Sequence, residues 1–216
     1  TPKPSSAASD VYKRQVYYMT PKWQQFYKVA LYIPVVLPAS VVAVMWKFML
    51  NKDIGLVNTL LRLVGLDNLT HAWIGEKSTA LGTVIAVNTW QYIGFTMVLF
   101  YIAMMNISKD VLESAAVDGA TKKDLFFNFF LPLTAGTTET NVILSISGGM
   151  KSFALFYMLT GGGPGKATTV VAQLIYTTAF VDFKFYRALA MSTVLFIIIL
   201  TLVLISRLIG RRYNYE

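Results

Sequence analysis

The residues whose types could do chemistry are few, and they form no catalytic constellation. The chain has no cysteine, which excludes disulfide frameworks and thiol catalysis, and its single histidine leaves too few ligands for a zinc site. That histidine, His71, lies between Asp67 and Glu76 and reads as part of a solvated loop. No paired carboxylate, activated nucleophile or general base is present. We therefore predict no enzyme activity, no metal and no cofactor.

Polar side chains inside apolar stretches are a second chemical signal. One polar and aromatic stripe recurs at i, i+3, i+4 and i+7, which a helix places on one face: Asn88, Gln91, Tyr92 and Phe95. Such a stripe suits a neutral sugar, whose hydroxyls bond to amides while its C–H face stacks on a ring. Adhesion between helices by amide side chains is the alternative. Glu139 is an acid in an apolar stretch, where pairing across subunits, a structural hydrogen bond and substrate contact all remain open.

Four long apolar stretches must position these groups, and they predict a membrane protein. Of 216 residues, 55% are hydrophobic and 14% charged, against about a quarter charged in soluble domains. A spanning helix needs about 20 apolar residues, and such stretches lie at about 29–50, 80–107, 125–150 and 188–206. The expected fold class is an all-α polytopic helical bundle embedded in membrane lipid. Its net charge of +8 comes from loop lysines and arginines, so we expect no nucleic-acid partner.

The remaining segments show how the chain is organised. Residues 1–15 lack apolar periodicity and are predicted to be a disordered tail or a sequence scar, whereas residues 16–216 form one transmembrane domain. Two longer connections, 51–79 and 160–187, lie on one side of the membrane. The lysines and arginines of the loops divide evenly between the two sides, so charge does not decide the orientation.

The most specific pattern lies in the loop 106–132. It predicts two short helices separated by a turn, with Asp110 and Glu113 early in the first helix, where the helix dipole favours acids. Gly119 is placed to end that helix in a left-handed conformation. The segment Thr121–Asp124 matches a capping pattern that begins the next helix.

This loop resembles the EAA loop found in membrane subunits of ABC importers. That pattern reads Glu-Ala-Ala, three residues, Gly, nine residues, Ile, one residue and Leu-Pro. Every spacing is kept here by Glu113, Ser114, Ala115, Gly119, Phe129, Leu131 and Pro132, with serine and phenylalanine as the two departures. The resemblance implies a cytoplasmic coupling helix that seats in a groove of an ATPase subunit. The residues expected to couple are Glu113, Ser114, Ala115, Ala116, Asp118 and Gly119.

A second segment resembles the external loop of sugar-type permeases. It begins with the run Leu159–Gly165, Leu-Thr-Gly-Gly-Gly-Pro-Gly, and continues to Tyr176 and Ala179-Phe180. The run is no Walker loop, because Gly165-Lys166 is followed by alanine, so ATP binding is expected of a partner. Over about residues 26–212 the chain resembles one of the two types of permease subunit found in maltose, lactose and glycerol-phosphate importers. That resemblance places the substrate path at Gln91, Tyr92, Phe95, Gly149 and Ser152, to which Glu139 is added as the anomalous acid.

These resemblances imply a type I ABC importer permease fold in a prokaryotic plasma (inner) membrane, with the C-terminus cytoplasmic. The expected partners are a second permease subunit in a heterodimer, an ATP-binding subunit dimer and an extracytoplasmic substrate-binding protein. The family usually has six core spans, and the first span here resembles the third. We therefore expect two spans to be missing, through truncation or in a natural four-helix variant. A non-transporting fragment and an ion-coupled secondary transporter remain alternatives.

Overall fold

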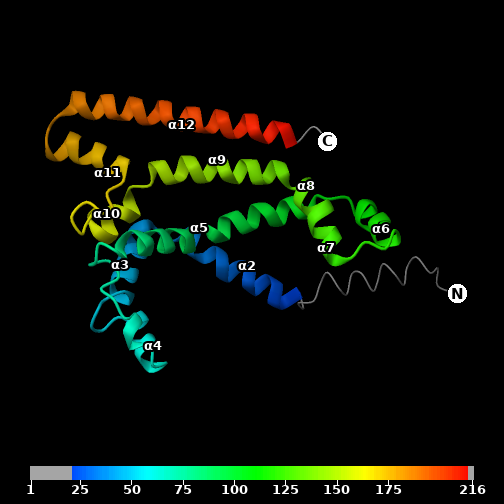
Figure 1. Cartoon of the computed structure of the whole chain (residues 1–216), viewed down its shortest axis with the longest axis horizontal. Helices are drawn as coiled ribbons and strands as arrows, with labels where there is room; N and C mark the ends of the chain where they lie inside the picture. The colour runs from blue at the N-terminus through cyan, green and yellow to red at the C-terminus, as the bar shows by residue number, and fades with distance from the viewer. Residues whose placement is uncertain (1–20, 214–216) are drawn as a thin grey trace.

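The computed structural model describes residues 21–213, and the regular structure in that range is helical (Figure 1). The expected all-α class is confirmed there, and the tail predicted at 1–15 lies outside the described residues. The longer helices are α2 (Pro21–Val36), α3 (Ala39–Met49), α4 (Leu56–Leu63), α5 (Ala80–Met105), α6 (Lys109–Val117), α9 (Ala135–Lys151), α10 (Ala154–Thr160), α11 (Val171–Tyr176) and α12 (Phe185–Tyr213). The shorter elements are η1 (Asp67–Leu69), α7 (Lys122–Asp124), η2 (Leu125–Phe130), α8 (Leu131–Leu133) and η3 (Thr177–Val181).

Two of these helices are long and apolar enough to cross a bilayer unaided. They are Ala80–Met105 and Phe185–Gly210, of 26 residues each, which at about 1.5 Å per residue exceed the hydrocarbon thickness. Two further segments qualify only as bent pairs: Phe26–Val36 with Ala39–Met49, bent by 103°, and Ala135–Lys151 with Ala154–Thr160, bent by 46°. The described range therefore holds two spans, or up to four if each bent pair crosses as one.

The sharp bend between α2 and α3 is caused by a proline and is stabilised by a hydrogen bond from α5. Pro38 lacks an N–H to continue the helical hydrogen bonds, and it disfavours helical φ and ψ angles at Leu37. The helix therefore breaks at Leu37 and Pro38. The carbonyl of Leu37 instead accepts a hydrogen bond of 3.2 Å from the Gln91 amide of α5. One turn further along α5, Gly94 faces the backbone of α2 so closely that an added Cβ would overlap the carbonyl of Leu31. The segment predicted as the first span is thus bent by contacts with α5 as well as by proline.

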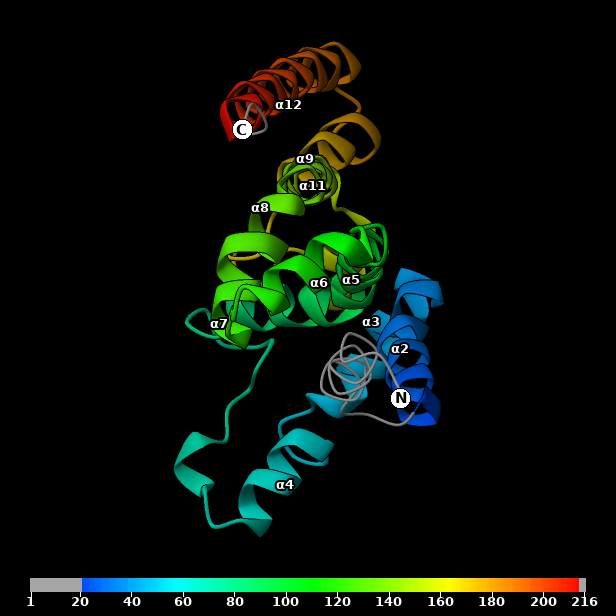
Figure 2. The ribbon, with the colours of Figure 1, turned by 90° about the vertical axis from the view of Figure 1, so that its right-hand side faces the viewer.

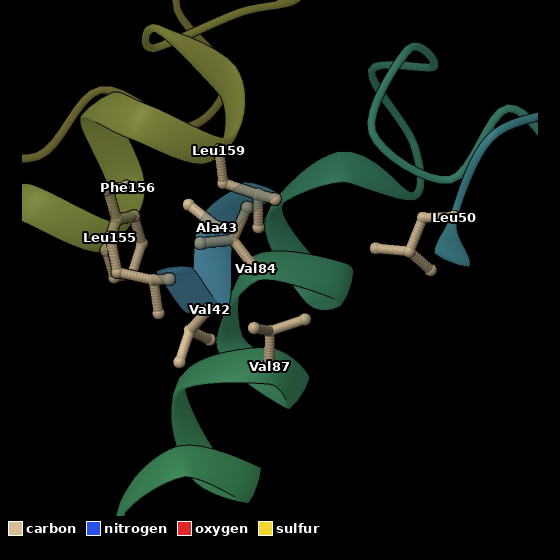
Figure 3. Packing of buried hydrophobic residues seen from close by; sticks show 8 residues of the cluster. All are labelled: Val42, Ala43, Leu50, Val84, Val87, Leu155, Phe156 and Leu159. Carbon is tan, nitrogen blue, oxygen red and sulfur yellow. The ribbon is translucent and has the colours of Figure 1, made fainter. Parts of the chain in front are cut away.

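The buried apolar core lies where α3, α5 and α10 meet, and Figure 3 shows its packing. The residues from within α3 and α5 are alanine and valine, whereas α10 contributes the larger leucine and phenylalanine side chains. The cluster consists of Val42, Ala43, Leu50, Val84, Val87, Leu155, Phe156 and Leu159. Most large apolar side chains elsewhere are exposed, and only 11% of the apolar window of α12 is buried. Such a surface suits helices that face lipid or partner subunits.

The long helices separate two ends of the molecule. In Figures 1 and 2, α9 lies between α5 and α12, and it contacts both. At one end of this arrangement are α6, α7 and the end of α12, and at the other are α3, α4 and α10 (Figure 1). The predicted coupling loop and the buried core therefore lie at opposite ends of the spans.

Candidate functional site

The predicted coupling helix is α6, and its residues divide between two surroundings. Ala115 is buried, and α6 contacts η2. Glu113 and Asp118 are exposed, and Ser114 is exposed although its hydroxyl donates to the carbonyl of Val111 at 3.0 Å. The helix thus rests on the chain through a small residue and presents its acids outward.

A left-handed turn ends α6 as predicted. Gly119 has φ +81°, and nothing lies within 4 Å of a Cβ added there, so its requirement is conformational. The Ala120 N–H donates to the carbonyl of Ala115 at 3.0 Å, which is the six-residue closure of a Schellman motif. A side chain other than glycine at this position would strain the turn that sets the direction of the loop.

A reciprocal cap begins the next helix, also as predicted. The Thr121 N–H donates to the Asp124 carboxylate at 2.9 Å, and the Asp124 N–H donates to the Thr121 hydroxyl oxygen at 3.3 Å. The Thr121 hydroxyl bonds the same carboxylate and, with the backbone N–H, holds the pKa of Asp124 below its ordinary value. The turn and the cap together give the loop a defined geometry.

The second short helix of the loop differs from the simple helix expected. After the three residues of α7 the chain forms a π-helix, η2, in which the Leu131 N–H donates to the carbonyl of Phe126, five residues back. Pro132 has no N–H for the carbonyl of Asn128, which disfavours the ordinary i to i+4 pattern here. The wider turn leads through α8 into α9, so the coupling loop continues into a membrane helix without a flexible linker.

The stripe predicted on α5 is divided between packing and exposure. Gln91 is 2% exposed, and its amide donates a hydrogen bond to the Leu37 carbonyl. This contact agrees with the alternative interpretation of the stripe, in which amide side chains join neighbouring helices. Tyr92 and Phe95 are exposed, at 48% and 38%. Two rings of the stripe therefore remain open to another molecule, whereas its central amide stabilises the fold.

Several buried polar atoms on and near residues 88–91 of α5 have no hydrogen-bond partner within residues 21–213. Trp46 packs edge-on against Trp90 with ring centroids 5.4 Å apart. The buried atoms Trp46 Nε1, Asn88 Oδ1 and Gln91 Oε1 have no hydrogen-bond partner among the described residues. Buried polar groups are normally paired, so this cluster is a polar feature inside an apolar helix pair.

The other predicted path residues lie at the end of α9. Ser152 is the C-terminal cap of α9, and its N–H donates to the carbonyl of Gly149 at 3.2 Å. Gly149 is exposed, with nothing within 4 Å of an added Cβ. Because α5 and α9 are in contact, these positions and the stripe lie on neighbouring helices.

A row of aromatic rings begins beside Ser152, and the sequence interpretation did not find it. Neighbouring ring centroids in the row are 4.9 to 6.1 Å apart. Its members are Phe153, Tyr157, Tyr176, Phe180 and Phe185. They come from four elements and the bend between α9 and α10, so periodicity within one helix could not reveal the row. Tyr176 and Phe180 were visible only as parts of the external-loop pattern.

Glu139 lies near the α6 end of α9, away from the middle of the helix (Figure 1). Its carboxylate packs over Gly210 of α12, where an added Cβ would overlap it. The acid is partly buried, and the two helices run along one another. Glycine at this point makes room for the acid between α9 and α12, which is a packing contact inside the chain.

The glycine-rich loop is a fixed turn. Gly161 and Gly162 have φ of +64° and +92°. Gln173, 3% exposed, donates to the Gly161 carbonyl at 2.8 Å, and the buried Thr168 hydroxyl donates to the Gly163 carbonyl at the same distance. Side chains thus donate hydrogen bonds to the carbonyls of the loop. This agrees with the prediction that the segment is a structural turn and not a phosphate-binding loop.

An acid and the histidine of the connection between α3 and α5 form a local pair. His71 Nδ1 lies 3.2 Å from Glu76 Oε2, and both side chains are about two-fifths exposed, at 39% and 40%. The Ala72 N–H donates to the Glu76 carboxylate at 2.9 Å. This hydrogen bond is the main cause that lowers the pKa of Glu76, and the charge of His71 contributes less. Asp67 lies in η1, outside this pair.

Comparison with known proteins fits this architecture. Residues 13–215 match the family model described as binding-protein-dependent transport system inner membrane component. The chain belongs to this family. Membership confirms the resemblance to permease subunits of ABC importers that the coupling loop and the glycine-rich loop carry.

Two similar permease proteins show how much of the chain is alike in sequence and how much of each relative it covers. The probable ABC transporter permease protein YurN of Bacillus subtilis (strain 168) is 38% identical over 185 residues, which are 86% of this chain and 63% of YurN. The diacetylchitobiose uptake system permease protein NgcF of Streptomyces coelicolor is 31% identical over 86% of this chain and 53% of NgcF. The chain thus spans less than two thirds of the length of these relatives.

A solved structure confirms the permease fold. It is the crystal structure of a bacterial alginate ABC transporter in complex with an alginate pentasaccharide-bound periplasmic protein. The TM-score is 0.82 at 22% identity, over 99% of this chain and 72% of the other. At this identity the likeness concerns the fold, which is that of a type I ABC importer permease.

Proposed function

We propose that this chain is a membrane-spanning subunit of an ATP-driven, binding-protein-dependent importer and forms part of its path for a carbohydrate. The solute would be a mono- or oligosaccharide or a glycerol-phosphate-like molecule. The observation that carries the proposal is the geometry of the coupling loop. An exposed acidic helix ends in a left-handed turn at Gly119, with every spacing of the EAA pattern kept. The names of NgcF and of the alginate transporter support the carbohydrate class.

Coupling would run from an ATPase subunit through α6 into the spans. Glu113 and Asp118 are exposed for polar contact with the ATPase, and Ala115 seats the helix on η2. From η2 the chain passes through α8 into α9 without a loop. The ATPase dimer hydrolyses ATP, and its closure biases the spans between inward- and outward-facing arrangements. Because α12 ends at the same end of the molecule as α6, a cytoplasmic coupling loop implies a cytoplasmic C-terminus (Figure 1).

The substrate path would use the exposed residues of α5 and the end of α9. Tyr92 and Phe95 offer rings on which a sugar can stack, and Gly149, near the end of the neighbouring helix α9, has open space around it. Ser152 adds a hydroxyl there, and a second permease subunit would close the path from the other side. An external binding protein would deliver the sugar at the end that carries the glycine-rich loop.

The substitution Gly119→Val tests the coupling step. A β-branched residue cannot adopt φ +81° without strain, so we expect the ATPase subunit to co-purify much less, while membrane insertion stays normal. Gly65→Val is the matched control, because Gly65 also has positive φ and open surroundings but lies in the external connection. Normal co-purification and normal uptake with Gly119→Val would contradict the proposed coupling role.

A further inference from the structure

The connection between α3 and α5 carries a large apolar surface that the fold leaves uncovered. Four side chains at i, i+4, i+7 and i+8 share one face of α4 and the residue after it, and we call them the α4 ridge: Leu56, Leu60, Leu63 and Val64. They are 51%, 52%, 77% and 69% exposed. The flanking residues Ile54, Leu66 and Leu69 are exposed as well. Contiguous apolar surface of this kind marks an interaction site.

The opposite face of α4 is anchored to the rest of the connection. Asn58 is fully buried, and its amide donates to the carbonyls of Lys52 and His71 at 3.0 and 2.9 Å. The indole N–H of Trp73 donates to the Asn58 amide oxygen at 2.7 Å. Val57 packs against the buried core cluster. The helix cannot roll to bury the ridge without breaking these three bonds, so the ridge faces outward as a property of the fold.

The position of α4 restricts what can cover the ridge. Both views show α4 outside the bundle of long helices (Figures 1 and 2), and Figure 1 shows it at the end away from α6. The connection leaves α3 after Met49 and enters the span α5 at Ala80, so both of its ends are tied to apolar helices. Exposed apolar residues already occur on the last turns of α3, where Val44 is 56% and Phe48 is 69% exposed. Along the chain, the exposed apolar surface therefore continues from a membrane helix into α4.

Charges flank the ridge in the pattern of a helix at a membrane surface. Lys47 is exposed in the last turn of α3, Lys52 is exposed between α3 and α4, and Arg62 is exposed within α4. The Arg62 guanidinium donates to the carbonyls of Asp53 and Lys52 at 3.3 Å. Helices with one apolar face and cations beside it lie in the headgroup layer, where the apolar face reaches the acyl chains. Three acids in the same connection, Asp53, Asp67 and Glu76, balance its three bases, so the cations beside the ridge and not a net charge are what a headgroup layer would meet.

We propose that α4 lies in the bilayer leaflet opposite α6, with the α4 ridge among the acyl chains and the flanking cations at the phosphates. The occupant of the ridge is lipid, not a protein partner. This contact would fix the outer ends of α3 and α5 at a constant depth. The inference requires only that the chain spans a membrane and does not depend on the solute or on the ATPase.

Spin labels on single cysteines test this placement, because the chain has no cysteine of its own. Leu60→Cys and Leu63→Cys place labels on the ridge, and Ser78→Cys places one at an exposed polar position of the same connection. The labelled full chain is reconstituted in phosphatidylcholine and phosphatidylglycerol vesicles, and collision with oxygen and with a water-soluble nickel chelate is measured. We expect the ridge labels to collide several-fold more with oxygen and several-fold less with nickel than the label at Ser78.

Two other results would overturn the proposal. Ridge labels that collide freely with the nickel chelate would place the ridge in water. Labels that collide with neither reagent would place a protein surface over it, from a second copy or from another subunit. The substituted side chains are exposed, so these variants leave the Asn58 anchor intact and the three outcomes remain distinct.

Discussion

Three buried amides show how single residues hold irregular backbone inside this protein. Gln91, Gln173 and Asn58 are each at most 3% exposed, and each donates to a backbone carbonyl at a helix break or in a turn. Such carbonyls lack a helical partner, and an apolar environment offers no water to replace it. The amide side chain supplies the missing donor, so these residues fix the backbone where the helical pattern fails.

The anchor at Asn58 should therefore be sensitive to loss of polarity. In Asn58→Leu the Trp73 indole and the carbonyls of Lys52 and His71 lose their partner, at a cost of about 1–3 kcal/mol for each buried group left unpaired. We expect a lower unfolding temperature and a changed Trp73 emission in detergent. Asn68→Leu, at an exposed position of the same connection, is the control and should change neither.

The rings of α5 predict a defect in transport that spares assembly. Tyr92→Ala removes an exposed ring from the proposed path without removing a hydrogen bond that the structure shows for it. We expect sugar uptake to fall by about tenfold, equivalent to about 1.4 kcal/mol, because aromatic stacking on the solute is lost. Ile93→Ala, at a neighbouring exposed position, should leave uptake unchanged. Full uptake with Tyr92→Ala would remove this ring from the path.

The pair of Glu76 and His71 predicts an effect of pH on the connection between α3 and α5. The pKa of Glu76 is lowered from 4.5 in the folded protein, so its contribution to stability is present above that value and is lost as the pH falls through the lowered pKa. We expect the protection of amides around Ala72, measured against the intrinsic exchange rate at each pH, to fall below about pH 4.5, and Glu76→Gln to remove this dependence. A variant with an unchanged acid response would show that another group titrates there.

At the scale of elements, the break between α2 and α3 depends on close contact with α5. Gly94→Val would drive a side chain into the backbone at Leu31, whereas Gly82→Val in the same helix meets nothing within 4 Å. We expect the first variant to lose folded, monodisperse protein in detergent and the second to retain it. Equal yields from the two variants would show that the contact at Gly94 is not required.

The same elements show which features a sequence can predict. The spans at α5 and α12 were predictable because they are continuous and apolar along their whole length. The two bent pairs were not, because hydropathy records composition but not direction. Pro38 was visible in the sequence, yet the angle of 103° is also set by Gln91 and Gly94 on another helix.

The candidate site divides in the same way between local and distant contacts. The turn at Gly119 and the cap at Thr121–Asp124 depend on residues within a few positions, and both are present as predicted. The helical period placed Gln91 and Tyr92 on one stripe but could not show that α2 and α3 pack against only part of it. The aromatic row as a whole needs four elements in place, because the contacts of Tyr176 with Phe153 and Tyr157 join parts of the chain about twenty residues apart.

At the scale of the whole molecule, the two ends should be reachable from opposite sides of the membrane. With no native cysteine, Glu113→Cys and Lys166→Cys each give one exposed thiol, on α6 and in the glycine-rich loop. We expect an impermeant maleimide to label Glu113→Cys only in inside-out vesicles and Lys166→Cys only in right-side-out vesicles. Labelling of both from one side would contradict the proposed orientation.

The place of α9 between α5 and α12 has a mechanical consequence. Its far end bends by 46° into α10, which is fixed in the buried core, while its near end follows the coupling loop directly. The helix is about 25 Å long, with the bend at Ser152 at one end and the packing contact with Gly210 of α12 near the other. If α6 carries a load from an ATPase, as we propose, that load would reach the Gly210 end of α9 first, and the two ends of the helix would move by different amounts.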